Sequence, residues 1–202
     1  MPSATALSRL TREIVACDLC PRLRVYCAEV ARLKRRAYLD WDYWGRPVPS
    51  FGDPEARLLV IGLAPAAHGA NRTGRMFTGD RSGDFLYRAL YETGFASQPS
   101  SRSRDDGLAL RDAWITAVVH CAPPDNKPTV EEIRTCRRWI EREIDLLKRV
   151  RVVVALGRIA FDVYLSLLRD RGIIVSRAPF AFGHNVAHPL SPALISSYHP
   201  SQ

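Results

Sequence analysis

The sequence predicts an α/β fold, with three layers (α/β/α) around a short, mainly four-stranded parallel sheet. The first observation behind this prediction is that apolar runs of strand length alternate along the chain with segments of helical periodicity. The second is that these runs are continuously apolar, which is typical of parallel strands covered on both faces. The third is that several of them lead into loops with polar residues, and open parallel sheets bind ligands at such strand ends.

These patterns predict four strands and five helices. The strands are expected over 58–61, 113–119, 151–156 and 194–198. The helices are expected over about 3–16, 22–36, 82–94, 129–147 and 157–168, and Thr129 with Glu132 fits a capping box at the start of the fourth. A Ser-, Arg- and Asp-rich stretch over 96–106 has no periodicity and is predicted to be a loop. No linker separates two domains, so residues 1–202 are expected to form one domain.

Composition and charge limit the possible functions. The content of 47% hydrophobic and 25% charged residues is ordinary for a globular protein. No apolar run approaches the roughly 20 residues of a membrane span, and the N-terminus lacks the apolar core of a signal peptide, so we expect a cytoplasmic protein with no membrane partner. The net charge of +8 favours a polyanionic partner, although a basic surface without a specific role fits it equally well.

The loop after the first strand is the most informative stretch. It reads GLAPAAHGANRTGRMFTGD over 62–80, and its compact, apolar beginning is typical of a pocket wall. It lacks the Lys of a Walker A loop and the glycine spacing of a dinucleotide fingerprint. ATP and NAD are therefore poor candidates as ligands.

Four of the five cysteines form two pairs that are distant in sequence. Cys17 and Cys20 make a C-x-x-C pair. Cys121 follows the second strand, and Cys136 lies on the next helix. A disulfide framework is not expected in the cytoplasm. The spacing fits a structural zinc site, an iron-sulfur cluster or four unrelated buried thiols, and does not choose among them.

The motifs resemble those of one enzyme family. GLAPAAHG over 62–69, NRTGR over 71–75 and FTGD over 77–80 resemble the first motif of the family 5 (B-type) uracil-DNA glycosylases, and HPS over 199–201 resembles their second. The resemblance implies an enzyme that flips a deaminated base out of DNA and hydrolyses its N-glycosidic bond. It also implies a structural iron-sulfur (4Fe-4S) cluster on Cys17, Cys20, Cys121 and Cys136, which leaves Cys27 as a spare thiol.

The resemblance also assigns residues to the base pocket. The substrate-binding residues would be Gly62, Ala64, Pro65, Ala66, His68, Phe77, Ala117 and Ser201. Phe77 would stack on the extruded base, although a core aromatic is equally compatible with the sequence. Ala117 stands where uracil-strict relatives have an Asn that bonds the edge of uracil, so we expect other deaminated bases such as hypoxanthine and xanthine to be accepted. His68 would either face the pocket or hold the loop.

Three residues are expected to carry the chemistry. Asp80 would orient or deprotonate the attacking water or stabilise positive charge on the sugar, although an Asp before 81–82 also fits a helix N-cap. Ala64 is inert where other branches of the superfamily have a polar residue, and the resemblance moves that role to Asp80 and Asn126. His199 would donate a hydrogen bond to the base carbonyl oxygen that gains charge as the bond breaks.

The favoured hypothesis is a monomeric glycosylase that acts on double- or single-stranded DNA containing deaminated bases. The alternative is a non-catalytic nucleic-acid-binding module stabilised by an iron-sulfur cluster or zinc. A small-molecule α/β hydrolase is disfavoured because no G-x-S-x-G motif is present. In the family, the HPS motif continues into a loop that wedges the duplex, and the sequence given ends at Gln202.

Overall fold

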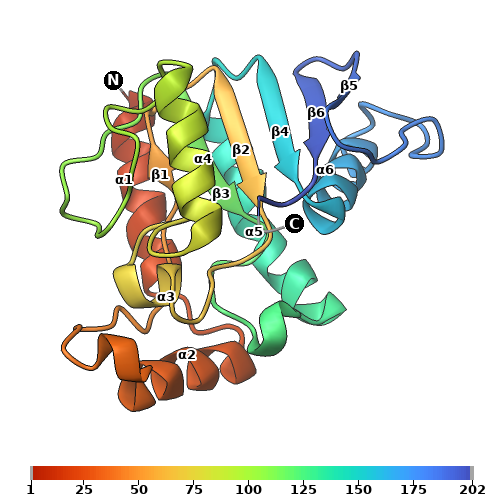
Figure 1. Cartoon of the computed structure of the whole chain (residues 1–202). Helices are drawn as coiled ribbons and strands as arrows, with labels where there is room; N and C mark the ends of the chain where they lie inside the picture. Colours follow the sequence, from red (N-terminus) through yellow and green to blue (C-terminus); the bar gives the residue numbers. More distant parts are fainter. Residues whose placement is uncertain (1, 201–202) are drawn as a thin grey trace.

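A six-stranded sheet forms the centre of the protein. The computed structural model describes residues 2–200, and its strands lie in the order β1-β3-β2-β4-β6-β5 (Figure 1). The strands are β1 (Phe51–Gly52), β2 (Leu58–Gly62), β3 (Ala113–Ala117), β4 (Val152–Leu156), β5 (Val186–His188) and β6 (Ala193–Ser197). The four inner strands pair in parallel, while β1 and β5 pair antiparallel at the two edges. This confirms the predicted fold class and adds two edge strands.

The register of the sheet brings the ends of the parallel strands to one edge. Gly62 at the end of β2 lies opposite Ala117 at the end of β3. Leu156 at the end of β4 lies opposite Ser197 at the end of β6. The loops that leave these four strands therefore start side by side.

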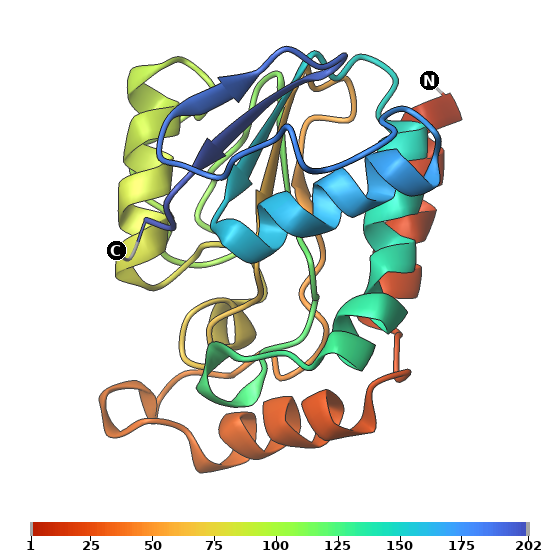
Figure 2. The same ribbon diagram turned by 90° about the vertical axis from the view of Figure 1, so that its right-hand side faces the viewer.

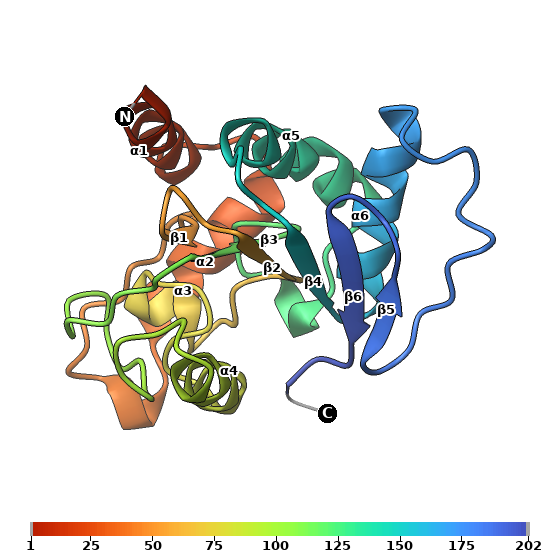
Figure 3. The same ribbon diagram turned by 90° about the horizontal axis from the view of Figure 1, so that it is seen from above.

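Helices cover both faces of the sheet. The α-helices are α1 (Pro2–Val15), α2 (Pro21–Leu33), α3 (Ala70–Thr73), α4 (Arg81–Glu92), α5 (Val130–Leu146) and α6 (Arg158–Asp170), and the 3-10 turns are η1 (Arg36–Tyr38) and η2 (Pro124–Asn126). Figures 2 and 3 show α1, α5 and α6 on one side of the sheet and α4 on the other. The three layers follow directly from this arrangement.

The strands send side chains into two hydrophobic cores. Leu59 and Ile61 of β2 pack with α1, α5 and α6, whereas Val60 packs with α4. Because both faces are covered, neither set of alternating positions carries polar residues, and the strand reads as one apolar run. This is why the inner strands can be predicted from the sequence.

Helix α2 lies outside these layers. It sits beyond the carboxyl ends of the strands, below α3 in the view of Figure 1. It ends at Leu33, three residues earlier than predicted, because Lys34 adopts a left-handed backbone (φ 54°) while its N–H bonds to Val30 O.

The predicted capping box of Thr129 and Glu132 is present at the start of α5. Among the described residues, no helix combines the length and the apolar character needed to cross a bilayer.

Candidate active site

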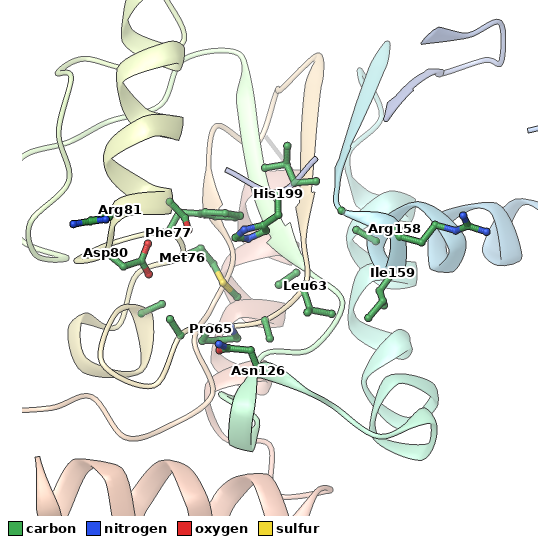
Figure 4. A pocket seen from close by; sticks show the side chains of 18 residues that line it. Leu63, Pro65, Met76, Phe77, Asp80, Arg81, Asn126, Arg158, Ile159 and His199 are labelled. Atoms are coloured by element: carbon green, nitrogen blue, oxygen red, sulfur yellow. The ribbon is translucent and has the colours of Figure 1, made fainter. Parts of the chain in front are cut away.

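One cavity opens where the four parallel strands end. It has a volume of about 600 Å³, which is in the usual range for small-molecule sites. It is lined by Leu63, Ala64, Pro65, Ala66, Ala70, Met76, Phe77, Asp80, Arg81, Ser82, Ala117, Asn126, Leu156, Gly157, Arg158, Ile159, Ala160 and His199 (Figure 4). Most of the wall is apolar and a few polar side chains face the space, as in sites that enclose an organic ring and orient it.

An aromatic pair forms one side of the cavity. The rings of Phe77 and His199 are stacked, with centroids 6.0 Å apart and an interplanar angle of 25°. Phe77 has a left-handed backbone (φ 52°), which is uncommon for a residue with a bulky side chain. A Cβ at position 62 would lie 2.7 Å from the Phe77 ring, so only Gly62 allows the ring to pack against the end of β2. Gly62 thus supports the cavity from behind and does not line it.

Asp80 serves two parts of the structure at once. Its Oδ1 accepts a hydrogen bond from the Gly83 N–H (3.0 Å), so the residue is the N-cap of α4, the alternative function foreseen from the sequence. Its other oxygen, Oδ2, would lie 2.3 Å from a Cβ at position 69, and Gly69 leaves it room. The carboxylate therefore keeps one oxygen outside the helix cap while it lines the cavity.

Arg72 fixes the loop that carries Asp80. Its guanidinium donates to His68 O (2.7 Å) and to Gly79 O (3.1 Å). The same group lies 3.9 Å from the ring centroid of Tyr38 and 4.0 Å from that of Trp41. The NRTGR segment thus ties the wall of the cavity to the FTGD segment and to Tyr38 and Trp41, which precede β1.

Burial sets the charge state of His199. Loss of solvent lowers the pKa of its imidazole, and the negative charge of Asp80 offsets this only in part. The ring is therefore neutral near pH 7, and a neutral imidazole carries one N–H. A neutral donor aimed into a largely apolar cavity suits a substrate oxygen that gains negative charge.

His68 does not line this cavity. It borders a second, more polar cavity that shares Ala66, Asp80, Arg81 and Asn126 with the first. Its Nδ1 lies 3.1 Å from the Tyr43 hydroxyl, so the imidazole braces the loop, one of the two possibilities left open by the sequence.

Eight of the predicted site residues border the first cavity. They are Ala64, Pro65, Ala66, Phe77, Asp80, Ala117, Asn126 and His199. Asn126 is held there by η2, where it and Asp125 both have left-handed backbones (φ 56° and 53°). Ser201 lies outside the described residues.

The part of the cavity wall that follows β4 was not predicted from the sequence. Gly157, Arg158 and Ile159 border the cavity, and they follow the end of β4 directly. The rule that ligands bind at the carboxyl ends of parallel strands would have identified them, because the third predicted strand ends at the same edge.

Four cysteines line a separate small cavity. Cys17, Cys20, Cys121 and Cys136 face it from the ends of α1, α2 and β3 and from α5. Burial, with smaller contributions from the neighbouring Cys121 and Cys17, raises the pKa of Cys20 to about 11. Within residues 2–200, no three His, Cys, Asp or Glu side chains form a group that could hold a single metal ion. Cys27 is buried nearby, with Sγ 3.5 Å from Ala122 O, and is not part of this cavity wall.

Comparison with known proteins agrees with this geometry. Residues 49–202 match the family model of the uracil DNA glycosylase superfamily. A type-5 uracil-DNA glycosylase of Thermus thermophilus is 53% identical over 189 residues, which cover 94% of this chain and 84% of the relative. The type-5 enzymes of Mycobacterium leprae and Pyrobaculum aerophilum are 50% and 47% identical, covering 98% and 93% of this chain and 86% and 79% of the relatives. The chain belongs to the uracil DNA glycosylase superfamily.

Proposed function

We propose that this protein is a DNA glycosylase that removes uracil and other deaminated bases by hydrolysing the N-glycosidic bond. The single observation that supports this most is the cavity at the carboxyl ends of the four parallel strands, where Phe77, Asp80, Asn126 and His199 meet. The type-5 relatives are named as uracil-DNA glycosylases. Their names, at about half identity over almost the whole chain, favour an enzyme over a non-catalytic nucleic-acid-binding module.

The proposed chemistry separates charge between the base and the sugar. As the bond breaks, negative charge grows on the base and positive charge on the sugar. His199 donates its N–H to the base oxygen, and Phe77 stacks on the base. The Asp80 oxygen that does not cap α4 orients the attacking water and stabilises the sugar cation, and Asn126, which also lines the cavity, makes a second hydrogen bond to that water.

The base specificity is proposed to be broad. Ala117 is 2% exposed at the end of β3 and presents only a methyl group to the cavity. A methyl group makes no hydrogen bond to the base edge and so does not select for the uracil pattern of donors and acceptors. We therefore include hypoxanthine and xanthine among the substrates.

The four cysteines are proposed to hold a 4Fe-4S cluster with a structural role. The donor set supports this, because four thiols with no carboxylate face one cavity, and thiolates are the ligands of iron-sulfur clusters. When bound, the group would cross-link α1, α2, the end of β3 and α5.

The protein is proposed to act as a single-domain monomer on DNA. A DNA substrate places it in the compartment that holds the chromosome, which we take to be the cytoplasm. The net charge of +8 supports association with a polyanion.

The test of the function is release of uracil from a duplex, followed by cleavage of the abasic strand with alkali. The full chain should cleave a uracil-containing strand, and Asp80→Asn should slow single-turnover excision by roughly 100-fold or more. Asn is as good an N-cap as Asp, so this change keeps α4 capped and removes only the charge. Asp84→Asn, an exposed change in the first turn of the same helix, is the matched control and should keep the wild-type rate.

Two results would contradict the proposal in different ways. A folded wild-type chain that releases no base from any deaminated duplex would remove the glycosylase activity itself. An Asp80→Asn variant as fast as the wild type would leave the activity but take the catalytic role away from Asp80.

A further inference from the structure

A series of tilted aromatic ring contacts leads from the core to the surface beside the active-site cavity. Phe161 is buried in the core, and its ring centroid lies 5.6 Å from that of Phe182. The ring centroid of Phe182 lies 6.0 Å from that of Tyr198, and the Tyr198 centroid lies 5.2 Å from that of His184. We call Phe161, Phe182, Tyr198 and His184 the aromatic ladder.

The outer end of the ladder is open to solvent and firmly held. Tyr198 is 52% exposed although it is a large hydrophobic residue. The Nδ1 of His184 lies 3.1 Å from the Ser197 hydroxyl, which fixes its ring beside Tyr198. Tyr198 is held by two neighbouring rings, Phe182 and His184, so its exposed part loses little conformational freedom when a flat group binds against it.

The ladder is continuous with the active-site cavity. Tyr198 directly precedes His199, and Arg158, which lines the cavity together with His199 (Figure 4), lies 5.9 Å from the Phe182 ring centroid. The antiparallel pairing of Val186 with Ser196 brings the segment that carries His184 to the same edge of the sheet as the cavity.

The charge around the ladder suits a polyanion. The last 32 residues, 171–202, contain no Asp or Glu, whereas the whole chain of 202 residues has 21. An even distribution would place about three carboxylates in that stretch. The same stretch contains Arg177, and Arg158, which forms an ion pair with Asp162 (2.8 Å), is adjacent to Phe182. A partner rich in negative charge meets no carboxylate of residues 171–200 here, and the carboxylate of Asp162 on α6 is balanced by its ion pair with Arg158.

We propose that the aromatic ladder is a second DNA contact, in which Tyr198 stacks on the base next to the extruded nucleotide in the same strand. This inference rests on the proposed function, because it needs a nucleotide in the cavity. A nucleotide base with a phosphate on either side matches the chemistry of this surface. The base can stack on the exposed aromatic ring, and the phosphates are attracted by the arginines. The base beside an everted nucleotide has lost a stacking neighbour, and Tyr198 replaces that neighbour.

The test uses a duplex with a tetrahydrofuran abasic analogue and 2-aminopurine at the adjacent position. This probe is not cleaved, and the fluorescence of 2-aminopurine falls when the base stacks on an aromatic ring. The wild-type full chain should quench the fluorescence on binding. Tyr198→Ala should lose that quenching and bind about 5- to 150-fold more weakly, the range expected for loss of one base–aromatic stack.

Two further variants separate stacking from structure. Tyr198→Phe keeps the ring and should keep both the quenching and the affinity. Tyr91→Ala removes a tyrosine of similar exposure, 48%, from the surface of α4 and should behave as the wild type. The thermal midpoint of each variant shows whether it is folded.

The outcomes distinguish this inference from the proposed function. A wild-type chain that excises uracil but whose Tyr198→Ala variant keeps affinity and quenching would overturn the ladder contact alone. A wild-type chain that excises no base would overturn the proposed function. Loss of affinity in Tyr198→Phe equal to that in Tyr198→Ala would also contradict stacking, because the ring is still present.

Discussion

At the scale of single residues, the proposed broad specificity of the base pocket follows from a hydrogen-bonding group that it lacks. Ala117 offers no hydrogen bond to the bound base, so introducing an amide at this position should narrow the range of substrates. We expect Ala117→Asn to raise the ratio of uracil to hypoxanthine excision rates by about tenfold or more, because a base that leaves the buried amide unpaired loses roughly 1–3 kcal/mol. Single-turnover rates on matched duplexes measure this ratio.

The matched control is Ala117→Val, which adds bulk without an amide. It should change both rates in parallel and leave their ratio near that of the wild type. Wild-type activity restricted to uracil would contradict the argument, and so would an unchanged ratio in Ala117→Asn.

Some features of the site residues could be predicted from the sequence and others could not. Asp80, Asn126 and His199 could be predicted to meet, because each follows or precedes an element that ends at the same edge of the sheet. The two functions of Asp80 could not be separated from the sequence, since one carboxylate both caps α4 and borders the cavity. The position of His68 depends on the Tyr43 hydroxyl, a partner 25 residues away that no local pattern reveals.

At the scale of elements, the inner strands and the long helices were predictable because their patterns are long. The edge strands β1 and β5 have only two and three residues, and α3 has four. Such short segments carry no periodicity, and their conformation depends on the neighbours with which they pair.

A buried carboxylate links α5 to β3 and should make stability depend on pH. Glu143 accepts hydrogen bonds from Trp114 Nε1 (3.3 Å) and Thr116 Oγ1 (2.5 Å). Burial raises the pKa of Glu143 to about 7, against hydrogen bonds from Ser50, Thr116 and Trp114 that lower it. The ordinary value is 4.5, so from there to about pH 7 the folded state holds a proton that the unfolded state has released. The stability contribution of Glu143 is complete below pH 4.5 and is lost as the pH rises through 7.

We therefore expect Glu143→Gln to flatten the pH dependence of stability. Gln still accepts a hydrogen bond through its amide oxygen but does not ionise, so it avoids a penalty of roughly 3 kcal/mol that Glu143 incurs by pH 8. Denaturant unfolding at intervals from pH 5 to 8 measures the slope. Glu141→Gln, a partly exposed change on the same helix, is the control and should keep the wild-type slope. A wild-type slope in Glu143→Gln would mean that other groups cause the pH dependence.

At the scale of the whole molecule, α2 is the part that most needs a cross-link. The two main cores lie on the two faces of the sheet, while α2 packs through a small separate cluster of Leu23, Cys27, Cys121 and Ala122 beyond the strand ends. An ion pair of Arg22 with Glu132 (2.7 Å) joins it to α5. So small an apolar contact gives limited stabilisation, and the four cysteines lie where a cluster would reinforce it.

Removal of one proposed ligand should therefore affect stability through loss of iron. We expect Cys136→Ser to lose the visible absorbance and the bound iron of the wild type. The thermal midpoint should fall by about 6–20 °C, because loss of a covalent-type cross-link between distant segments costs about 3–5 kcal/mol.

Cys27→Ser is the control, since it removes a buried thiol that does not line the cysteine cavity, and it should keep its iron. A wild-type protein purified without oxygen that binds zinc in place of iron would contradict the cluster, and equal iron content in Cys136→Ser and the wild type would contradict its ligand assignment. Because the active-site cavity is bordered by other residues, iron loss should reduce excision at temperatures where α2 detaches and leave it nearly unchanged well below them.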